Sequence, residues 1–210
     1  MKIFSVLLVL FAINVAAAEN NLKMYYKNED ITKIIEVYSK ASGQKFIVDP
    51  GVRGKISIFL QQPVSVEEAF NHLSSALAIN GYAISRQGDT MIVKAARNIQ
   101  RDLIEVSSDL PSIKPERMYT WVYKVKNIPA EGINRDLRIL TSKEGEMVTL
   151  ANTNQLIITD WTSNLNRIAA IVAQIDIALD PATAKIVEAA KKQEEANRKA
   201  HDGKKPEGDN

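Results

Sequence analysis

Very few side chains of this sequence have the type and spacing that catalysis or metal binding requires. Cysteine is absent, so the chain has no thiolate nucleophile, no thiolate metal ligand and no disulfide. His72 and His201 lack partner ligands at a metal-binding spacing, and Glu68 of the pair Glu67–Glu68 is explained by helix capping. No Ser-His-Asp or Gly-x-Ser-x-Gly arrangement is present. The sequence therefore predicts a protein that is not an enzyme and that binds no metal and no cofactor.

One short motif has the spacing of a nucleic-acid clamp. Residues 51–54 read Gly-Val-Arg-Gly, but the clamp of that pattern joins two helices, whereas these residues fall between two expected strands. A tight β-turn is the simpler interpretation. The charges are also balanced: without Lys2, which lies in the export signal described below, 26 basic residues stand beside 25 acidic ones. We therefore predict no nucleic-acid partner.

Four residues are candidates for binding a protein partner. Met24, Tyr25 and Tyr26 fit an exposed edge strand, which can recruit a partner strand through its backbone, although an ordinary half-buried strand has the same pattern. Trp161 lies in an expected turn. A large aromatic side chain there either anchors an interface or packs over its own helix. For residues 24–26 and for Trp161, partner binding and a purely structural role both remain open.

The first 18 residues have the pattern of a secretory signal peptide. Lys2 is followed by an apolar run over residues 3–13, and Ala16-Ala17-Ala18 is a small-residue cleavage site. The run is shorter than the about 20 apolar residues that span a bilayer, so an uncleaved anchor is the less favoured alternative. We expect an exported, periplasmic protein with no direct membrane span after cleavage.

Residues 22–96 are expected to form a first domain with the element order β-α-β-β-α-β-β. Asn28 or Asp30 can cap the first helix, and Gly43 lies just past its end. Ser65 and Glu68 form a capping box for the second helix. The final two strands are expected to form a hairpin around residues 87–89.

Residues 97–117 are expected to be a linker, because Pro111 and Pro115 punctuate them, although residues 103–106 could add a short docking strand. Residues 118–179 are expected to form a second domain of order β-α-β-β-α. Its last strand is the apolar run 156–158. Its last helix has cap candidates at Thr162, Ser163 and Asn164 and an apolar stripe at Leu165, Ile168, Ala169, Val172 and Ile175.

Residues 181–210 are rich in Ala, Lys and Glu and are expected to be a charged, solvated helix that ends in a disordered tail. The predicted fold class is therefore α+β. Two small two-layer α/β sandwich domains, the second with KH-like β-α-β-β-α order, are followed by a C-terminal charged helix and tail.

The two domains together resemble the N-terminal periplasmic domains of secretins, the outer-membrane ring channels of secretion and pilus systems. In the first domain the resemblance rests on Phe46-Ile47-Val48-Asp49-Pro50, Val52, Gly54-Lys55-Ile56-Ser57, Pro63-Val64-Ser65, Glu68-Ala69-Phe70, Leu77 and Gly81-Tyr82. In the second domain it rests on Asn154, Leu156-Ile157-Ile158-Thr159-Asp160, Asn164, Ile168 and Gln174-Ile175-Asp176. The pattern is similar to the N0 and N1 modules of the type II protein D branch.

The resemblance implies a docking role in the periplasm, in association with an outer-membrane complex. A secretin continues into a large barrel that forms the pore, whereas a charged tail follows residue 179 here, so we expect no pore of its own. The implied partners are a secretin ring, an inner-membrane secretion component or cargo, and a homo-oligomer is an open alternative. The first domain also resembles the N-terminal extension of TonB-linked receptors, an envelope signalling module. That family lacks the second domain, so residues 154–176 favour the secretin interpretation.

Overall fold

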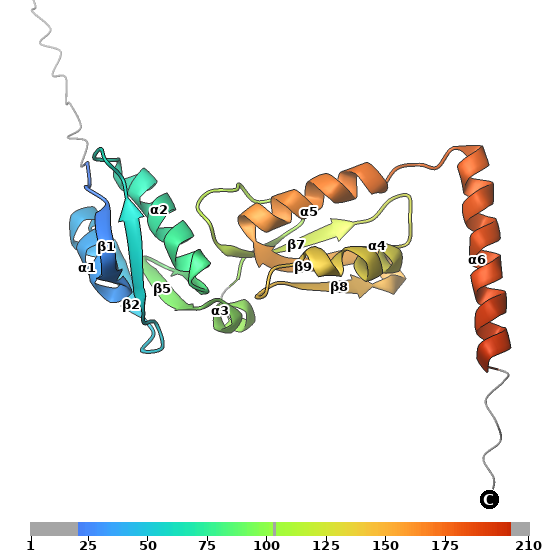
Figure 1. Ribbon diagram of the computed structural model, residues 1–210, viewed down its shortest axis with the longest axis horizontal. Helices are drawn as coiled ribbons and strands as arrows, with labels where there is room; N and C mark the ends of the chain where they lie inside the picture. Colours follow the sequence, from blue (N-terminus) through green and yellow to red (C-terminus); the bar gives the residue numbers. More distant parts are fainter. Residues whose placement is uncertain (1–20, 103, 203–210) are drawn as a thin grey trace, which may run out of the picture.

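Two α/β domains lie in a row and are followed by a long helix (Figure 1). The computed structural model describes residues 21–102 and 104–202. The predicted signal peptide, residues 1–18, lies outside the described residues, as do residues 203–210 of the predicted tail. The mixed α+β class predicted from the sequence is confirmed.

The first domain has the predicted order of strands and helices. Its elements are β1 (Tyr25–Asp30), α1 (Ile31–Ser42), β2 (Lys45–Val48), β3 (Lys55–Phe59), α2 (Val66–Ile79), β4 (Tyr82–Gln87) and β5 (Thr90–Ala95). The strands divide between two sheets. β1 pairs with β3 in an antiparallel pair, and β2-β5-β4 form a mixed sheet in which β5 is central. Strands β4 and β5 form the predicted hairpin.

The two helices join the two sheets into one core. Helix α1 contacts β1 and β2, and α2 contacts β3 and β4. Tyr38 of α1 is almost fully buried, and its ring lies 5.9 Å from the rings of both Phe46 and Phe70. These ring pairs connect α1 to β2 and to α2, so neither sheet depends on its own strands alone.

Local capping explains where these helices begin and end. Asp30 is the N-cap of α1, and its Oδ1 accepts a hydrogen bond from the Thr32 backbone N–H at 2.9 Å. Gly43 ends the helix with φ +70°, a conformation that glycine adopts without steric cost. At the start of α2, the Ser65 hydroxyl accepts from the Glu68 N–H at 3.2 Å. The predicted caps at Asp30, rather than Asn28, and at Gly43 are confirmed, and so is the Ser65 half of the predicted capping box. The other half is not observed, because the Glu68 carboxylate lies 3.7 Å from His72 instead.

The second domain also has the predicted order. Its elements are β7 (Met118–Lys124), α4 (Ala130–Leu137), a 3-10 turn (Arg138–Leu140), β8 (Glu146–Leu150), a second 3-10 turn (Ala151–Thr153), β9 (Gln155–Trp161) and α5 (Thr162–Ile175). Strand β9 lies between β7 and β8, antiparallel to both. Leu156 and Ile158 of β9 are fully buried against Leu165 and Ile168 of α5, so the strand and the helix that follows it share one core.

The segment predicted as a linker contains regular structure. Helix α3 (Ala96–Asp102) follows β5 directly, and β6 (Val106–Ser107) pairs in parallel with β7. The short docking strand expected near residues 103–106 therefore corresponds to β6. Ile99 of α3 is 1% exposed, so this segment contributes to a core rather than only connecting two domains.

The last described element is α6 (Pro181–Asp202), which stands apart from the second domain (Figure 1). Asp180 caps it, because its Oδ1 accepts from the N–H groups of Ala182 and Thr183. Ile186 is 69% exposed, so its apolar side chain does not anchor the helix to the rest of the described chain. Over the parts of the chain that the structure describes, no helix combines the length and apolar character needed to cross a membrane.

Candidate docking site

Strand β1 has one unpaired edge and presents an aromatic pair to solvent. Among the described residues β1 pairs only with β3. Tyr25 is 59% exposed and Phe59 of β3 is 54% exposed, with ring centroids 5.3 Å apart. A bulge interrupts the pairing after Tyr26, where Asn28 has φ +53° and donates its N–H to the Ser57 hydroxyl. The bulge confines the regular edge to the start of the strand, where a partner strand could pair.

The four candidate partner-binding residues differ in how exposed their side chains are in the structure. Tyr25 is exposed and Tyr26 is half-buried, but Met24 is 1% exposed and belongs to the core of the first domain. Trp161 is 8% exposed. Met24 and Trp161 are therefore corrected as contact residues, because their side chains are covered by the chain itself. Exposure depends on tertiary packing, which the sequence pattern around these residues does not encode.

Trp161 instead anchors the second domain to the first. Its side chain packs in a small cluster with Ala83 of β4, Ile99 of α3 and Met118 of β7. Its indole Nε1 donates to Glu144 at 3.4 Å. The cluster joins residues from both domains into one apolar contact, so the anchoring role lies within the chain.

A polar contact at the same junction supports this connection. The guanidinium of Arg97 in α3 donates from Nη2 to the backbone carbonyl oxygen of Lys143, with a distance of 3.0 Å. Since Lys143 precedes β8, this bond links the end of the first domain to a loop of the second.

Polar residues in and beside β9 and α5 hold loops of the second domain in place through hydrogen bonds. Asn154, at φ +52°, donates from Nδ2 to the carbonyls of Val125 and Ile128 and accepts from the Ala130 N–H at 2.8 Å. It thereby fixes the chain between β7 and α4. This satisfies backbone groups that a turn would otherwise leave without partners.

Asp160 does the same for the loop before β8. Its side chain is fully buried, with Oδ2 accepting from the Ser142 N–H at 2.8 Å and from Asn164 Nδ2 at 2.6 Å. Its Oδ1 accepts from the Trp161 N–H at 2.7 Å. The carboxylate is therefore occupied by structural hydrogen bonds rather than open to a substrate or a metal.

Asp176, just past the end of α5, holds the segment that follows β7 in the same way. It accepts hydrogen bonds from the Tyr123 hydroxyl at 2.7 Å and from the backbone N–H groups of Lys126 and Asn127 at 2.9 and 2.7 Å. Burial opposes the charge, but these hydrogen bonds lower the pKa of Asp176 below its usual value. Burial and the neighbouring Asp176 carboxylate raise the pKa of Tyr123 to about 12.

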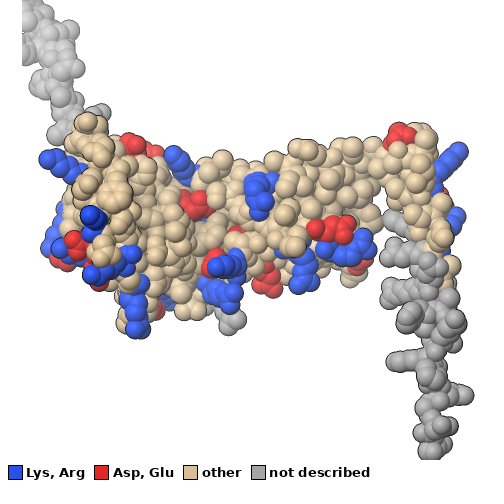
Figure 2. All heavy atoms as spheres, in the orientation of Figure 1, with Lys and Arg blue, Asp and Glu red and all other residues tan. Residues whose placement is uncertain are grey.

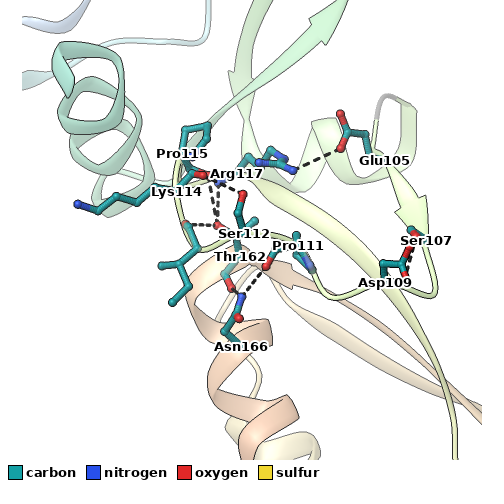
Figure 3. Close-up of polar contacts among 11 residues, drawn as sticks. Glu105, Ser107, Asp109, Pro111, Ser112, Lys114, Pro115, Arg117, Thr162 and Asn166 are labelled. Carbon is teal, nitrogen blue, oxygen red and sulfur yellow. Dashed lines mark hydrogen bonds and ion pairs between the residues drawn. The ribbon is translucent and has the colours of Figure 1, made fainter. Parts of the chain in front are cut away.

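Residues 108–117 are strapped to the second domain rather than free (Figure 3). The Thr162 hydroxyl, which is fully buried, donates to the Ile113 carbonyl at 2.9 Å, and Asn166 Nδ2 donates to the Pro111 carbonyl at 2.9 Å. The Trp121 indole donates to the Ser108 carbonyl at 3.0 Å. We call residues 108–117 the strap.

The strap also caps α5, which corrects the expected cap. Trp161 occupies the N-cap position and makes no side-chain capping bond, while Thr162 is already helical. The Glu116 carboxylate supplies the acceptor instead, at 3.2 Å from the Ser163 N–H. A carboxylate at a helix N-terminus is electrostatically favourable. The sequence did not reveal this cap because the capping residue lies 47 positions away.

The remaining motif residues occupy structural positions. Residues 51–54 lie in the connection between β2 and β3, where the Val52 N–H donates to the Asp49 carbonyl at 2.9 Å, as in a tight β-turn. His72 faces Glu68 at 3.7 Å on the exposed side of α2. Within residues 21–102 and 104–202, no group of three or more potential ligands is placed to hold a metal ion. Basic and acidic side chains are interspersed on the face shown in Figure 2.

Comparisons with known proteins agree with this architecture. The family described as "GspD-like, N0 domain" matches residues 24–93, and the "bacterial type II/III secretion system short domain" matches residues 120–180. The chain therefore carries two N-terminal domains of the secretin type, a GspD-like N0 domain followed by a bacterial type II/III secretion system short domain.

Individual relatives are consistent with this assignment. The chain is 27% identical over 150 residues to the secretin XcpQ of Pseudomonas aeruginosa, covering 71% of this chain and 22% of that protein. It is 26% identical over 167 residues to the secretin GspD of Vibrio cholerae, covering 78% of this chain and 25% of that protein. The chain thus spans about a quarter of the length of these secretins.

A solved structure shows the same fold. The type II secretion system outer membrane complex of Klebsiella pneumoniae, which contains PulD, PulS and the PulC HR domain, matches with a TM-score of 0.66 and 23% identity. The match covers 75% of this chain and 27% of that chain. The second-domain family match also favours the secretin interpretation over the receptor alternative.

Proposed function

We propose that this chain is a periplasmic docking protein of a type II secretion or type IV pilus-like system. It binds secretion components through its two secretin-type domains and acts without a catalytic step. The single observation that carries this proposal is the ordered pair of family matches over residues 24–93 and 120–180. The structures of relatives include one in complex with PulS and a PulC domain, which supports protein partners for this chain too.

Within this role, the start of β1 is the proposed contact surface. Tyr25 and Phe59 form an exposed aromatic pair beside an unpaired strand edge, and Tyr26 is half-buried next to them. A partner strand would pair with the backbone while its side chains cover the two rings. Aromatic side chains of this size supply much of the binding energy in protein interfaces.

Site-specific cross-linking in the producing bacterium tests this proposal. A photoreactive phenylalanine analogue replaces Tyr25 in one variant and Ile79 in the other. Ile79 is an 86% exposed residue of α2 and serves as the matched control. We expect Tyr25, but not Ile79, to capture a secretin, an inner-membrane secretion component or secreted cargo, identified by mass spectrometry.

A double variant, Tyr25→Ser with Phe59→Ser, separates binding from folding. Because both side chains are exposed, we expect little change in stability but loss of the captured component. The proposed function would be wrong if neither the photoreactive chain nor the intact chain recovered any secretion or pilus component. The proposed surface alone would be wrong if the double variant recovered the component unchanged.

A further inference from the structure

An open groove of about 540 Å³ lies within the second domain, between helix α4 and strand β8. The helix lines one side with residues that include Glu131, Asn134 and Arg138, and the strand lines the other with residues 147–149. This volume is within the range of pockets that bind ligands, about 300–1,000 Å³. Because β8 belongs to the second domain, the groove is separate from the β1 surface of the first domain.

The strand side of the groove is a free edge of the sheet. In the order β6-β7-β9-β8, β8 is an outer strand, and among the described residues it pairs only with β9. Outside the sheet, the only hydrogen bond of residues 147–149 within the described chain is made by a side chain. It is the bond in which the Thr149 hydroxyl accepts from Asn134 Nδ2 at 2.8 Å. The outward backbone groups of β8 can therefore pair with an added strand, so an extended peptide is the ligand that matches this edge.

A row of β-branched side chains ends at the same edge. Val122 of β7, Ile157 of β9 and Val148 of β8 lie directly opposite one another across the three strands. Met147 belongs to the core beneath the helices, so its neighbour Val148 points to the other face of the sheet. Val148 and Leu150 share that face, and each is 43% exposed. An added strand would continue this row, so apolar residues opposite Val148 and Leu150 are expected to bind best.

The direction of α4 decides which end of the groove carries a charge. Asn134 of α4 bonds to Thr149, and the start of α4 is held by Asn154, which lies beyond the end of β8. The helix therefore runs antiparallel to β8. Arg138, one turn after Asn134, lies toward the start of β8.

Arg138 has no opposite charge beside it. Its side chain is exposed and makes no ion pair within residues 21–102 and 104–202. Arg135, which also lines the groove, already lies 3.0 Å from a carboxylate oxygen of Asp136. In an added strand, the residue opposite Met147 would point toward the helices, as Met147 does. An acidic residue at that position would lie near Arg138.

We propose that an extended segment of a partner protein adds as a strand to β8 and fills the groove beneath α4. The segment carries apolar residues opposite Val148 and Leu150 and an acidic residue opposite Met147. The inference rests on the docking role proposed above and adds to it a second contact, on the second domain.

Fluorescence anisotropy with synthetic peptides and the full chain tests the proposal. The probes are labelled octapeptides of Ser and Thr with a central Val-Thr-Val-Asp for antiparallel pairing or Asp-Val-Thr-Val for parallel pairing. In the control probes, either both valines are replaced by serine or the aspartate is replaced by lysine. We expect saturable binding of at least one acidic probe below about 1 mM, and at least about tenfold weaker binding of its two controls.

Variants of the chain then assign the binding to the groove. Arg138→Glu replaces an attraction by a repulsion, so it should weaken the acidic probe about tenfold and restore affinity for the lysine probe. Arg53→Glu, at an exposed arginine outside the groove, is the matched control and should change neither affinity. Val148→Thr keeps the shape of the side chain and should weaken the acidic probe about threefold through the lost apolar contact. Methylation of alternate peptide nitrogens should abolish binding in one register only, because only alternate N–H groups of an added strand face β8.

Several outcomes would overturn the proposal. These are no saturable binding by either acidic probe below about 1 mM, equal effects of Arg138→Glu and Arg53→Glu, and indifference to methylation in both registers. Concentration-dependent self-association of the chain that Arg138→Glu abolishes would show that a second copy, and not a partner protein, occupies the edge. Tyr25→Ser with Phe59→Ser should leave the peptide affinity unchanged. Because the probes are synthetic, failure of the β8 site is distinguishable from failure of the proposed function, which is measured by capture in the cell.

Discussion

Replacing Asp176 by alanine should destabilise the second domain strongly. The change removes the acceptor for the Tyr123 hydroxyl and for two backbone N–H groups, at distances between 2.7 and 2.9 Å. Hydrogen bonds to a charged acceptor contribute about 1.5–3 kcal/mol each. Lys126 and Asn127 are exposed, so water can replace part of the loss at their N–H groups. We therefore expect a decrease of about 2–4 kcal/mol in the free energy of unfolding.

Tryptophan fluorescence during urea unfolding measures this effect selectively. Both tryptophans of the chain, Trp121 and Trp161, lie in the second domain, on β7 and β9. The matched control is Asp136→Ala, which removes a carboxylate whose side chain is 64% exposed and should change stability by no more than about 0.5 kcal/mol. Tyr123→Phe removes one hydroxyl only and should cost about 1 kcal/mol.

The same pair predicts how stability depends on pH. Because the pKa of Asp176 is lower in the folded chain than the about 3.9 of a free aspartate, its contribution is present at neutral pH and is lost as pH falls through the folded pKa. Because the pKa of Tyr123 is raised to about 12, its contribution is present below about pH 10 and is lost as pH rises toward 12. Asp176→Asn should reduce the acid dependence, and Tyr123→Phe should reduce the alkaline dependence. A cost for Asp176→Ala no larger than that for Asp136→Ala would refute the assigned role.

Three further changes test other contacts. Gly145→Ala would place a Cβ 2.4 Å from a carboxylate oxygen of the buried Asp160 and should lower the free energy of unfolding by at least about 2 kcal/mol. Gly132→Ala in α4 would meet no atom within 4 Å and should raise the free energy of unfolding by about 0.5–1 kcal/mol. Equal urea midpoints for the two variants would contradict this. Thr162→Val removes the hydroxyl that holds the strap, so it should lower the free energy of unfolding by about 1–2 kcal/mol and accelerate proteolysis within residues 108–117. An unchanged rate of cleavage there would argue against the strap. Ile99→Asp places a charge in the cluster that joins the domains, so the emission of Trp161 should shift to the red while far-ultraviolet circular dichroism is retained. An unchanged emission maximum would show that the cluster does not depend on Ile99.

The order of elements could be predicted because its signals are local. Asp30 and Gly43 mark the two ends of α1 within a few residues of the apolar stripe they enclose, and the structure uses both as caps. The apolar run 156–158 likewise fixes β9 without reference to the rest of the chain. Such short-range patterns survive in the folded protein because packing reinforces them.

The long-range contacts could not be predicted in the same way. The sequence pattern predicts that Ile99 lies in a linker. Its side chain is buried because Trp161, more than 60 positions later, packs in the same cluster. The expected contact residues Met24 and Trp161 were covered for the same reason. A single sequence gives the amphipathic face of each element but not the element that covers it. The Glu116 cap of α5 is another long-range contact of this kind, since Glu116 and the Ser163 N–H that it accepts from lie in different segments of the chain.

The strap has a consequence for how the chain tolerates changes in length. The chain is fastened on both sides of positions 109–110. Before the strap, the Glu105 carbonyl accepts from the Thr120 N–H at 2.9 Å, and within the strap the Ile113 carbonyl accepts from the Thr162 hydroxyl at 2.9 Å. Because both fastenings lie on the second domain, extra residues inserted within positions 109–110 would enlarge a surface loop at a small entropic cost. They would leave the distance between the domains unchanged. An insertion between α3 and β6 would instead fall before both fastenings, in the connection across which the Trp161 cluster and the Arg97–Lys143 hydrogen bond hold the two domains together.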